Sequence, residues 1–148
     1  MGNFAISGTG LNTSGVALLG ITGSATIRGR VYDIIIGSRA TPADQTCTYD
    51  VARSTTVPTA TTVTPTPLDS LQPTHAASVT AWQNATTVPT KAAILLSVSL
   101  NQRATFRWVA APGSELQTTP TTAYGIYIYA LTPTPAAYIV ETTMLYTE

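Results

Sequence analysis

The stretch Lys91–Ala111, KAAILLSVSLNQRATFRWVAA, contains two successive strand patterns. From residue 92 to residue 100 every second side chain is apolar and falls on one face, because side chains alternate across a pleated sheet. After the polar pair at 101–102, Phe106 and Trp108 share a face, and burying one such ring stabilises a fold by roughly 2–3 kcal/mol. We therefore predict that this stretch forms a hairpin-like unit at the centre of a β core.

The composition favours strands and turns over helices. Of the 148 residues, 44% are hydrophobic and only 9% are charged, whereas a typical domain is about 25% charged. With one lysine and three glutamates, strong helix formers other than alanine and leucine are scarce. Threonine, proline and glycine are abundant, and this mixture is typical of strands joined by turns.

Further strand patterns lie on both sides of the opening stretch. Each is short, alternates with period two or is continuously apolar, and is bounded by turn residues. They cover residues 24–38, 46–54, 76–88, 124–131 and 137–146. We predict an all-β fold, an antiparallel β-sandwich of about eight short strands with jelly-roll-like or Greek-key topology; a barrel is the less favoured alternative.

Two segments depart from this pattern. Residues 1–23 are rich in glycine, and we predict an N-terminal arm or edge segment there, followed by a single sandwich domain over residues 24–148. Residues 55–74 contain four prolines, which remove ladder donors, and they predict a long loop with a short edge segment near residues 61–63. Such a loop is either functional, often at an interface, or merely tolerated at the surface, and both interpretations are open.

The residues that carry chemistry are few and scattered. His75 is the single histidine, and no motif joins it to Asp69, Ser70 or Ser78 as a triad would require. Cys47 is the single cysteine, which excludes an internal disulfide and indicates a small buried side chain. Metal-ligand and phosphate-binding spacings are missing, and we expect the aspartates to cap turns or to pair with arginines across strands. We therefore predict a protein that is not an enzyme, with no catalytic residue, no metal site and no cofactor.

The charge pattern argues against two further classes of function. The net charge is zero and the arginines are dispersed, so the basic patch that a nucleic-acid partner requires is missing. The nonpolar runs are far shorter than the roughly 20 residues that span a membrane. A near-neutral surface gives weak colloidal protection, which is compatible with a surface partly covered in an assembly.

Two segments resemble a known group of virion proteins. They are YDIIIGSRATPADQTCTYDVARST (Tyr32–Thr55) and LNQRATFRWVAAPGSEL (Leu100–Leu116), which together cover somewhat over a quarter of the chain. They resemble the small cement, or decoration, proteins on the heads of tailed bacteriophages, including cyanophages. The resemblance implies a β-sandwich, often a homotrimer, that binds the major capsid protein on the outer surface of the virion, at three-fold or quasi-three-fold positions.

The physics of a filled head is compatible with such a role. A trimer that touches several capsid subunits resists their separation by the outward pressure of the DNA, and tethering strengthens binding by roughly 10²–10⁴-fold. We expect the contacts to capsid or sister subunits to come from the segment around Phe4 and from the proline-rich loop at 57–73. The apolar contact residues expected in that loop are Val63, Leu68 and Leu71.

Two other functions remain as alternatives. The first is a carbohydrate- or receptor-binding β-sandwich of a phage tail or fibre, which requires an exposed groove of aromatic rings. The rings available for it are Trp82, Trp108, Tyr124, Tyr127 and Tyr129. The second is a hydrolase on a β scaffold, in which the single histidine would meet a carboxylate or a serine in one pocket.

Overall fold

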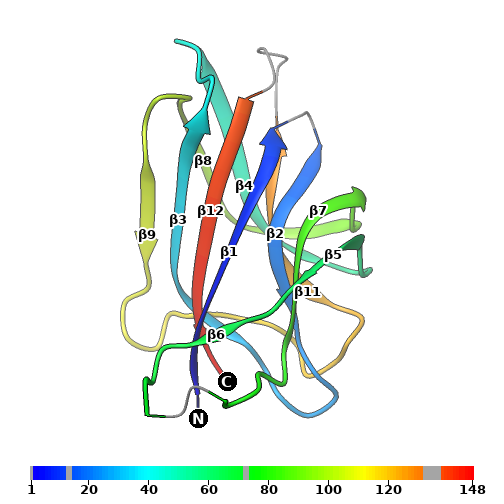
Figure 1. Cartoon of the computed structure of the whole chain (residues 1–148). Coiled ribbons are helices and arrows are strands. Elements are labelled where there is room, and N and C mark those ends of the chain that lie inside the picture. The colour runs from blue at the N-terminus through cyan, green and yellow to red at the C-terminus, as the bar shows by residue number, and fades with distance from the viewer. Residues whose placement is uncertain (1, 13–14, 72–73, 132–137) are drawn as a thin grey trace.

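The structure is a computed structural model that describes residues 2–12, 15–71, 74–131 and 138–148. These residues form no helix, and their strands build two antiparallel sheets that pack face to face (Figure 1). The all-β fold and the antiparallel sandwich predicted from the sequence are confirmed.

The described residues form twelve strands, more than the eight or so expected, because several are short edge pieces. The first sheet contains, in spatial order, β10 (Leu116–Gln117), β3 (Arg30–Ala40), β12 (Tyr138–Thr147), β1 (Asn3–Asn12) and β6 (Thr66–Pro67), and β9 (Phe106–Val109) also pairs with β3. The second sheet contains β5 (Thr59–Val63), β7 (Thr80–Thr87), β2 (Val16–Thr22), β11 (Gly125–Leu131), β4 (Thr46–Ser54) and β8 (Lys91–Asn101).

Eight of these strands follow the order of a jelly roll. The first sheet runs β1-β12-β3-β9 and the second runs β2-β11-β4-β8. Four changes of sheet lie toward the upper end of the sandwich in Figure 1, between β1 and β2, β3 and β4, β8 and β9, and β11 and β12. The chain also changes sheet between β2 and β3, at the lower end, and between β10 and β11. This nested pairing is the double Greek key of jelly rolls, with β5, β6 and β7 inserted between β4 and β8.

The core lies between the two sheets and draws on both. Its buried side chains include Phe4, Ile6, Leu18, Ile21, Ile34, Ile36, Val51, Ile126, Ile128, Val140 and Met144. The hydroxyl of Tyr138 crosses the core, where it forms hydrogen bonds with Cys47 Sγ at 3.0 Å and with the hydroxyl of Tyr49. The single cysteine is buried, as expected, and these core polar atoms satisfy one another.

The stretch Lys91–Ala111 does not form the central hairpin that its pattern predicts. Its two strands are β8 and β9, which are edge strands of different sheets and pair with β4 and β3 rather than with each other. At the turn that contains Gln102 the chain passes from the second sheet to the first. The buried Gln102 side chain accepts a hydrogen bond there from Ala43 N at 2.8 Å. The side chain of Ile94, in the first strand, is 54% exposed. Regular alternation of apolar and polar side chains is typical of a half-buried strand, and here that strand lies at the edge of its sheet.

The predicted N-terminal arm is also wrong. Residues 3–12 form β1, which pairs with β12 along its whole length, and residues 16–22 form β2 between β7 and β11. The glycines in this region permit close packing: a Cβ at Gly20 would collide with the ring of Tyr127. Residues 3–12 and 16–22 therefore belong to the same sandwich as the strands that follow them.

A bulge in β3 changes which of its residues face the core. The pairing with β12 skips Tyr32, so the apolar side chains that face the core are Val31 before the bulge and Ile34 and Ile36 after it. Simple alternation from Val31 would have put Ile35 in the core, but Ile35 is only half-buried.

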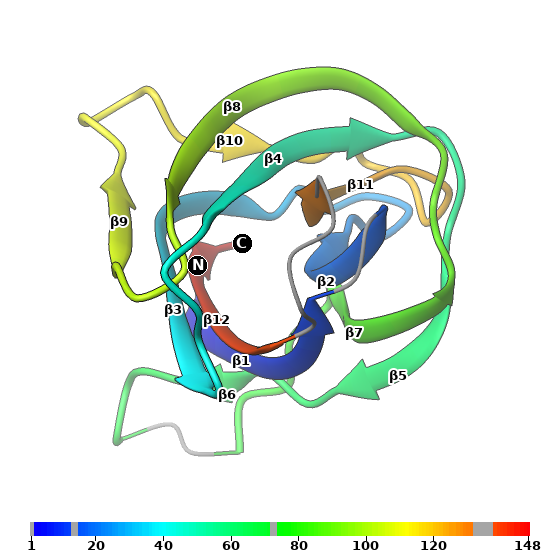
Figure 2. The same ribbon diagram turned by 90° about the horizontal axis from the view of Figure 1, so that it is seen from above.

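The outer face of the second sheet is covered by the chain itself. Tyr127 and Tyr129 of β11 are buried there beside Ala17 and Ala52. The covering segments are the β4–β5 and β7–β8 connections, which run around the outside of this sheet (Figure 2). They contain the buried residues Pro58 and Pro89, and they are joined by hydrogen bonds from Thr55 N to Thr90 O (3.0 Å) and from Thr90 N to Thr56 Oγ1 (2.8 Å). The strands of this sheet are therefore buried on both faces at their centre.

These buried tyrosines predict a loss of stability in alkali. Burial raises the pKa of Tyr129 to about 12, and burial also raises the pKa of Tyr127 and of Tyr146 above the ordinary value. Above pH 10 the unfolded chain therefore binds fewer protons than the folded chain, and each such tyrosine lowers the free energy of unfolding by about 1.4 kcal/mol per pH unit. Urea unfolding below pH 10 should show no such loss, and the same measurement between pH 10 and 12 should show a steep one.

The variant Tyr129→Phe is the matched control. It removes one ionising group, so its free energy of unfolding should fall less steeply in this range, by about 1.4 kcal/mol per pH unit. A flat free energy of unfolding between pH 10 and 12 for the unaltered protein would contradict the burial of these hydroxyls.

Candidate interaction surface

The four residues predicted to make contacts are not equally accessible. Phe4 is fully buried, so it is not available to a partner, whereas Leu68 is 49% and Leu71 is 90% exposed. Val63, at the end of β5, is half-buried. The structure nevertheless brings the four to one end of the sandwich, because β6 places Pro67 opposite Phe4 and Leu68 N donates to Asn3 O at 2.8 Å.

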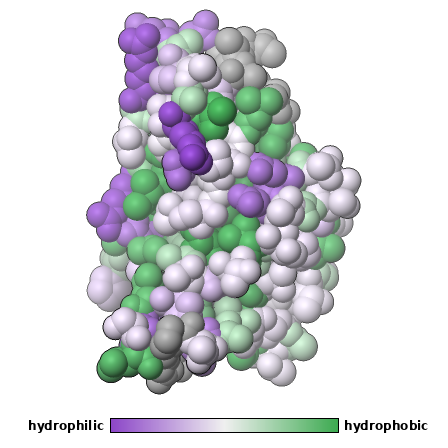
Figure 3. Space-filling view, in the orientation of Figure 1, coloured by the Kyte–Doolittle hydropathy of each residue, from purple (hydrophilic) through white to green (hydrophobic). Residues whose placement is uncertain are grey.

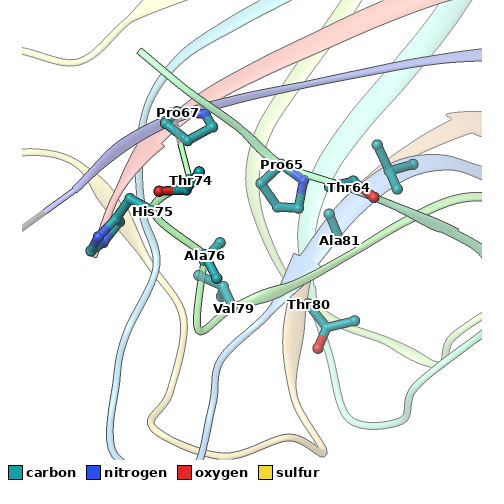
Figure 4. Close-up of a pocket in the computed structure, with 11 residues that line it drawn as sticks. Thr64, Pro65, Pro67, Thr74, His75, Ala76, Val79, Thr80 and Ala81 are labelled. Atoms are coloured by element: carbon teal, nitrogen blue, oxygen red, sulfur yellow. The ribbon is translucent and has the colours of Figure 1, made fainter. Parts of the chain in front are cut away.

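A shallow groove lies at this end, between β5–β6 and the segment that leads into β7. Its volume is about 420 Å³, and it is lined by Val63, Thr64, Pro65, Pro67, Thr74, His75, Ala76, Ala77, Val79, Thr80 and Ala81. Pro65 and Pro67 lie on one side, and Ala76 and Val79 lie on the other (Figure 4). The lining contains no Asp, Glu, Lys or Arg, so this groove suits an uncharged partner surface.

The two termini hold the segments that border the groove. The carboxylate of Glu148 accepts hydrogen bonds from Ser78 N at 2.8 Å and from Val79 N at 3.0 Å. Gly2 and Glu148 are joined by two backbone hydrogen bonds of 3.1 Å. Because of these contacts, the loop after β6 is fixed at its base while Leu71 projects into solvent.

An aromatic stack forms the support beneath this surface. The ring of Phe4 stacks on His75 at a centroid distance of 5.6 Å and on Tyr146 at 5.5 Å. We name the exposed and groove-lining residues above this stack the basal surface: Val63, Pro65, Pro67, Leu68, Leu71 and His75. Phe4 therefore supports the basal surface from inside and is not itself a contact residue.

The outer face of the first sheet is a second open surface. It carries small, hydroxyl and aliphatic side chains together with charged ones, and strongly hydrophilic residues stand out on it (Figure 3). The uncharged side chains include Ala5, Ser7, Thr9, Leu11, Ile35, Ile139, Thr143 and Leu145. Glu141 lies opposite Thr9, and Arg39 donates a hydrogen bond to Thr9 Oγ1 at 2.9 Å, so a partner on this face would also meet charged groups.

The groups needed for catalysis do not converge. His75 contacts the Phe4 ring, and Asp69 Oδ1 accepts a hydrogen bond from Leu71 N at 2.9 Å, as turn caps do. Among the described residues no group of three His, Cys, Asp or Glu side chains could hold a metal ion. The hydrolase alternative therefore has no assembled site among them.

The two strand aspartates pair across strands, but not with the arginines nearest in sequence. Asp33 receives a bidentate contact from Arg107 of β9, with the shortest N–O distance 2.6 Å. Asp50 accepts from Lys91 Nζ at 2.7 Å and from Ser97 Oγ at 2.6 Å, both on β8. These pairs attach the two edge strands to their sheets, so the aspartates have structural roles.

The aromatic groove expected for glycan binding does not form from the rings considered for it. Tyr127 and Tyr129 are buried under the β7–β8 connection, and Trp82 is half-buried beside them. Trp108 lies in the other sheet and packs partly against the core, while Tyr124 is 44% exposed in the connection before β11. These rings do not share one exposed surface.

Comparison with protein-family models, curated proteins and solved structures gives no match for this chain. Within the described ranges there is also no helix long and apolar enough to cross a membrane.

The anchoring of the basal surface by Glu148 gives a direct prediction. Glu148→Ala removes the acceptor of two backbone N–H groups, so the amides of Ser78 and Val79 should lose their protection from hydrogen exchange. Glu141→Ala is the control, since that exposed carboxylate on β12 has no hydrogen bond to this segment. Unchanged exchange rates at both amides in Glu148→Ala would contradict the anchoring.

Proposed function

We propose that this chain is a structural virion protein that binds the outside of a tailed-phage capsid. In this proposal it acts as a trimer at three-fold or quasi-three-fold positions, contacts the major capsid protein, and stabilises the head shell against the pressure of packaged DNA. The resemblance of Tyr32–Thr55 and Leu100–Leu116 to cement proteins suggests the class. The observation that carries the proposal is the basal surface, where Leu68 and Leu71 are exposed beside backbone that is hydrogen-bonded to the N-terminal strand.

The energetics of that surface suit a clamp. Burying one leucine side chain on a partner contributes roughly 2 kcal/mol, so Leu68 and Leu71 give each subunit a modest contact. Prolines at positions 65 and 67 and the hydrogen bonds to the termini fix the surface before binding, which lowers the entropy lost on docking. Three such contacts on one trimer act together, because the later ones are effectively intramolecular.

The outer face of the first sheet is a second surface that supports the same proposal. A cement protein touches sister subunits as well as the shell, so it needs more than one surface that a partner can cover. This chain has the basal surface at one end and the face of the first sheet along one side (Figures 1 and 3).

The test is binding to empty heads assembled from the major capsid protein of a tailed cyanophage. Leu71→Ser removes the most exposed leucine, and a loss of about 1.4 kcal/mol per contact corresponds to tenfold weaker binding, so head occupancy at limiting protein should fall at least tenfold. Occupancy is measured by quantitative gel analysis of sedimented heads.

The matched control is Val88→Ser, because Val88 is 40% exposed but lies in the β7–β8 connection, which covers the outer face of the second sheet. Its occupancy should equal that of the unaltered protein. Equal occupancy for both variants would remove the basal surface from the proposal, and no binding of the unaltered protein to any head would remove the proposal itself.

A further inference from the structure

Strand β8 has the longest free edge among the described strands. It pairs with β4 on one side and has no strand on the other, and it forms the outer arc of the sandwich in Figure 2. The other free edges are shorter: β1 is unpaired beyond Ala5 on the side of β6, β5 has five residues and follows a proline, β9 has four, and β6 and β10 have two each. With 11 residues, β8 offers a row of backbone donors and acceptors that another strand can satisfy.

The usual devices that protect an edge strand are missing from most of β8. Its single charged residue, Lys91, is held at 2.7 Å by Asp50, and residues 92–101 contain neither charge nor proline. The irregularities in its pairing with β4 fall between residues 91 and 96 of β8. From Leu96 to Asn101 the strand is regular, uncharged and open along one side.

The hydrogen bonding shows which backbone groups face outward. Gln102 N donates to Gln45 O at 2.9 Å, and the register pairs Val98 with Tyr49. Because the direction of backbone groups alternates along a strand, the peptide groups of Val98 point toward β4. Those of Ser97 and Ser99 therefore point toward the open edge.

The sequence of this edge reads the same in both directions. Leu96-Ser97-Val98-Ser99-Leu100 is a palindrome centred on Val98. We propose that two copies of this chain pair through β8, antiparallel about a two-fold axis at Val98, so that their second sheets join into one. Ser97 then exchanges backbone hydrogen bonds with Ser99 of the partner subunit, and Val98 meets the partner subunit's Val98 as a pair without hydrogen bonds.

The side chains agree with that pairing. Leu96, Val98 and Leu100 are half-buried and pack on the core of their own sandwich. In the pair each of these leucines lies opposite a leucine of the other copy, and the apolar row continues across the axis. The hydroxyls of Ser97 and Ser99 are already bonded to Asp50 and Thr48, so no polar side chain is stranded.

This contact is independent of the proposed trimer and of the basal surface. Neighbouring three-fold positions on a closed shell are related by local two-fold axes, so β8 pairing would join one trimer to the next. The shell is not needed for the test, however, since the pair is a property of this chain alone.

The experiment is disulfide trapping at high protein concentration with copper phenanthroline as the oxidant. In a pair without hydrogen bonds the opposed side chains lie close enough for a disulfide, so Val98→Cys should give a covalent dimer of about 31 kDa, twice 15.5 kDa, on a denaturing gel. Ser99→Cys is more exposed but would face Ser97 of the partner subunit, so it should give far less dimer. The unaltered protein is the blank, because its Cys47 is buried.

A second variant distinguishes a disulfide that depends on β8 pairing from one formed by random encounter of two molecules. Ser99→Pro removes a donor that points away from β4, so it should leave the melting temperature nearly unchanged and abolish the dimer when combined with Val98→Cys. The proposal is overturned if Val98→Cys forms no dimer, if Ser99→Cys forms as much, or if the proline leaves the dimer intact.

Discussion

The pairing of the first and last strands is the constraint on which the rest of the structure depends. Ten residues of β1 lie opposite ten of β12, and this ladder forms the middle of the first sheet. It places Phe4 against Tyr146 and brings Gly2 to Glu148, and these two ends in turn hold the loop that carries the exposed leucines. The order of the jelly roll, the burial of Phe4 and the geometry of the basal surface all follow from one contact between distant parts of the chain.

The few charged residues of this chain also fix the positions of two edge strands. The buried carboxylates of Asp33 and Asp50 each bind a cation on an edge strand, and so they fix β9 and β8 to opposite sheets. Removing one partner of such a pair leaves an uncompensated buried charge, which is strongly unfavourable. The remaining surface carries few charges, and the faces that the chain does not cover itself are left suited to contact with other proteins.

Part of this architecture could be predicted from the sequence. Composition and alternation gave the all-β class, the strand at Thr46–Ser54 and the burial of Cys47, because these features depend on local pattern. The place of Lys91–Ala111 could not be predicted, since the same alternation suits a central hairpin and two edge strands whose partners lie 37 or more residues away, from Ser54 to Lys91 upward. The glycine-rich start was misjudged for a related reason: glycine permits a flexible arm and close packing alike, and only the Tyr127 ring beside Gly20 decides between them.

The same distinction applies to the candidate site. The exposure of Leu68 and Leu71 could be predicted, because both residues lie in a proline-rich loop. The stacking of His75 on Phe4 and the hydrogen bond from Ser78 N to the Glu148 carboxylate could not, because they form only in the folded sandwich. An electron cryomicroscopy map of decorated heads would test directly whether this chain binds the shell through the basal surface. Density for this chain is expected at three-fold positions, with residues 63–71 facing the shell. Density elsewhere, or with that loop facing solvent, would contradict this expectation.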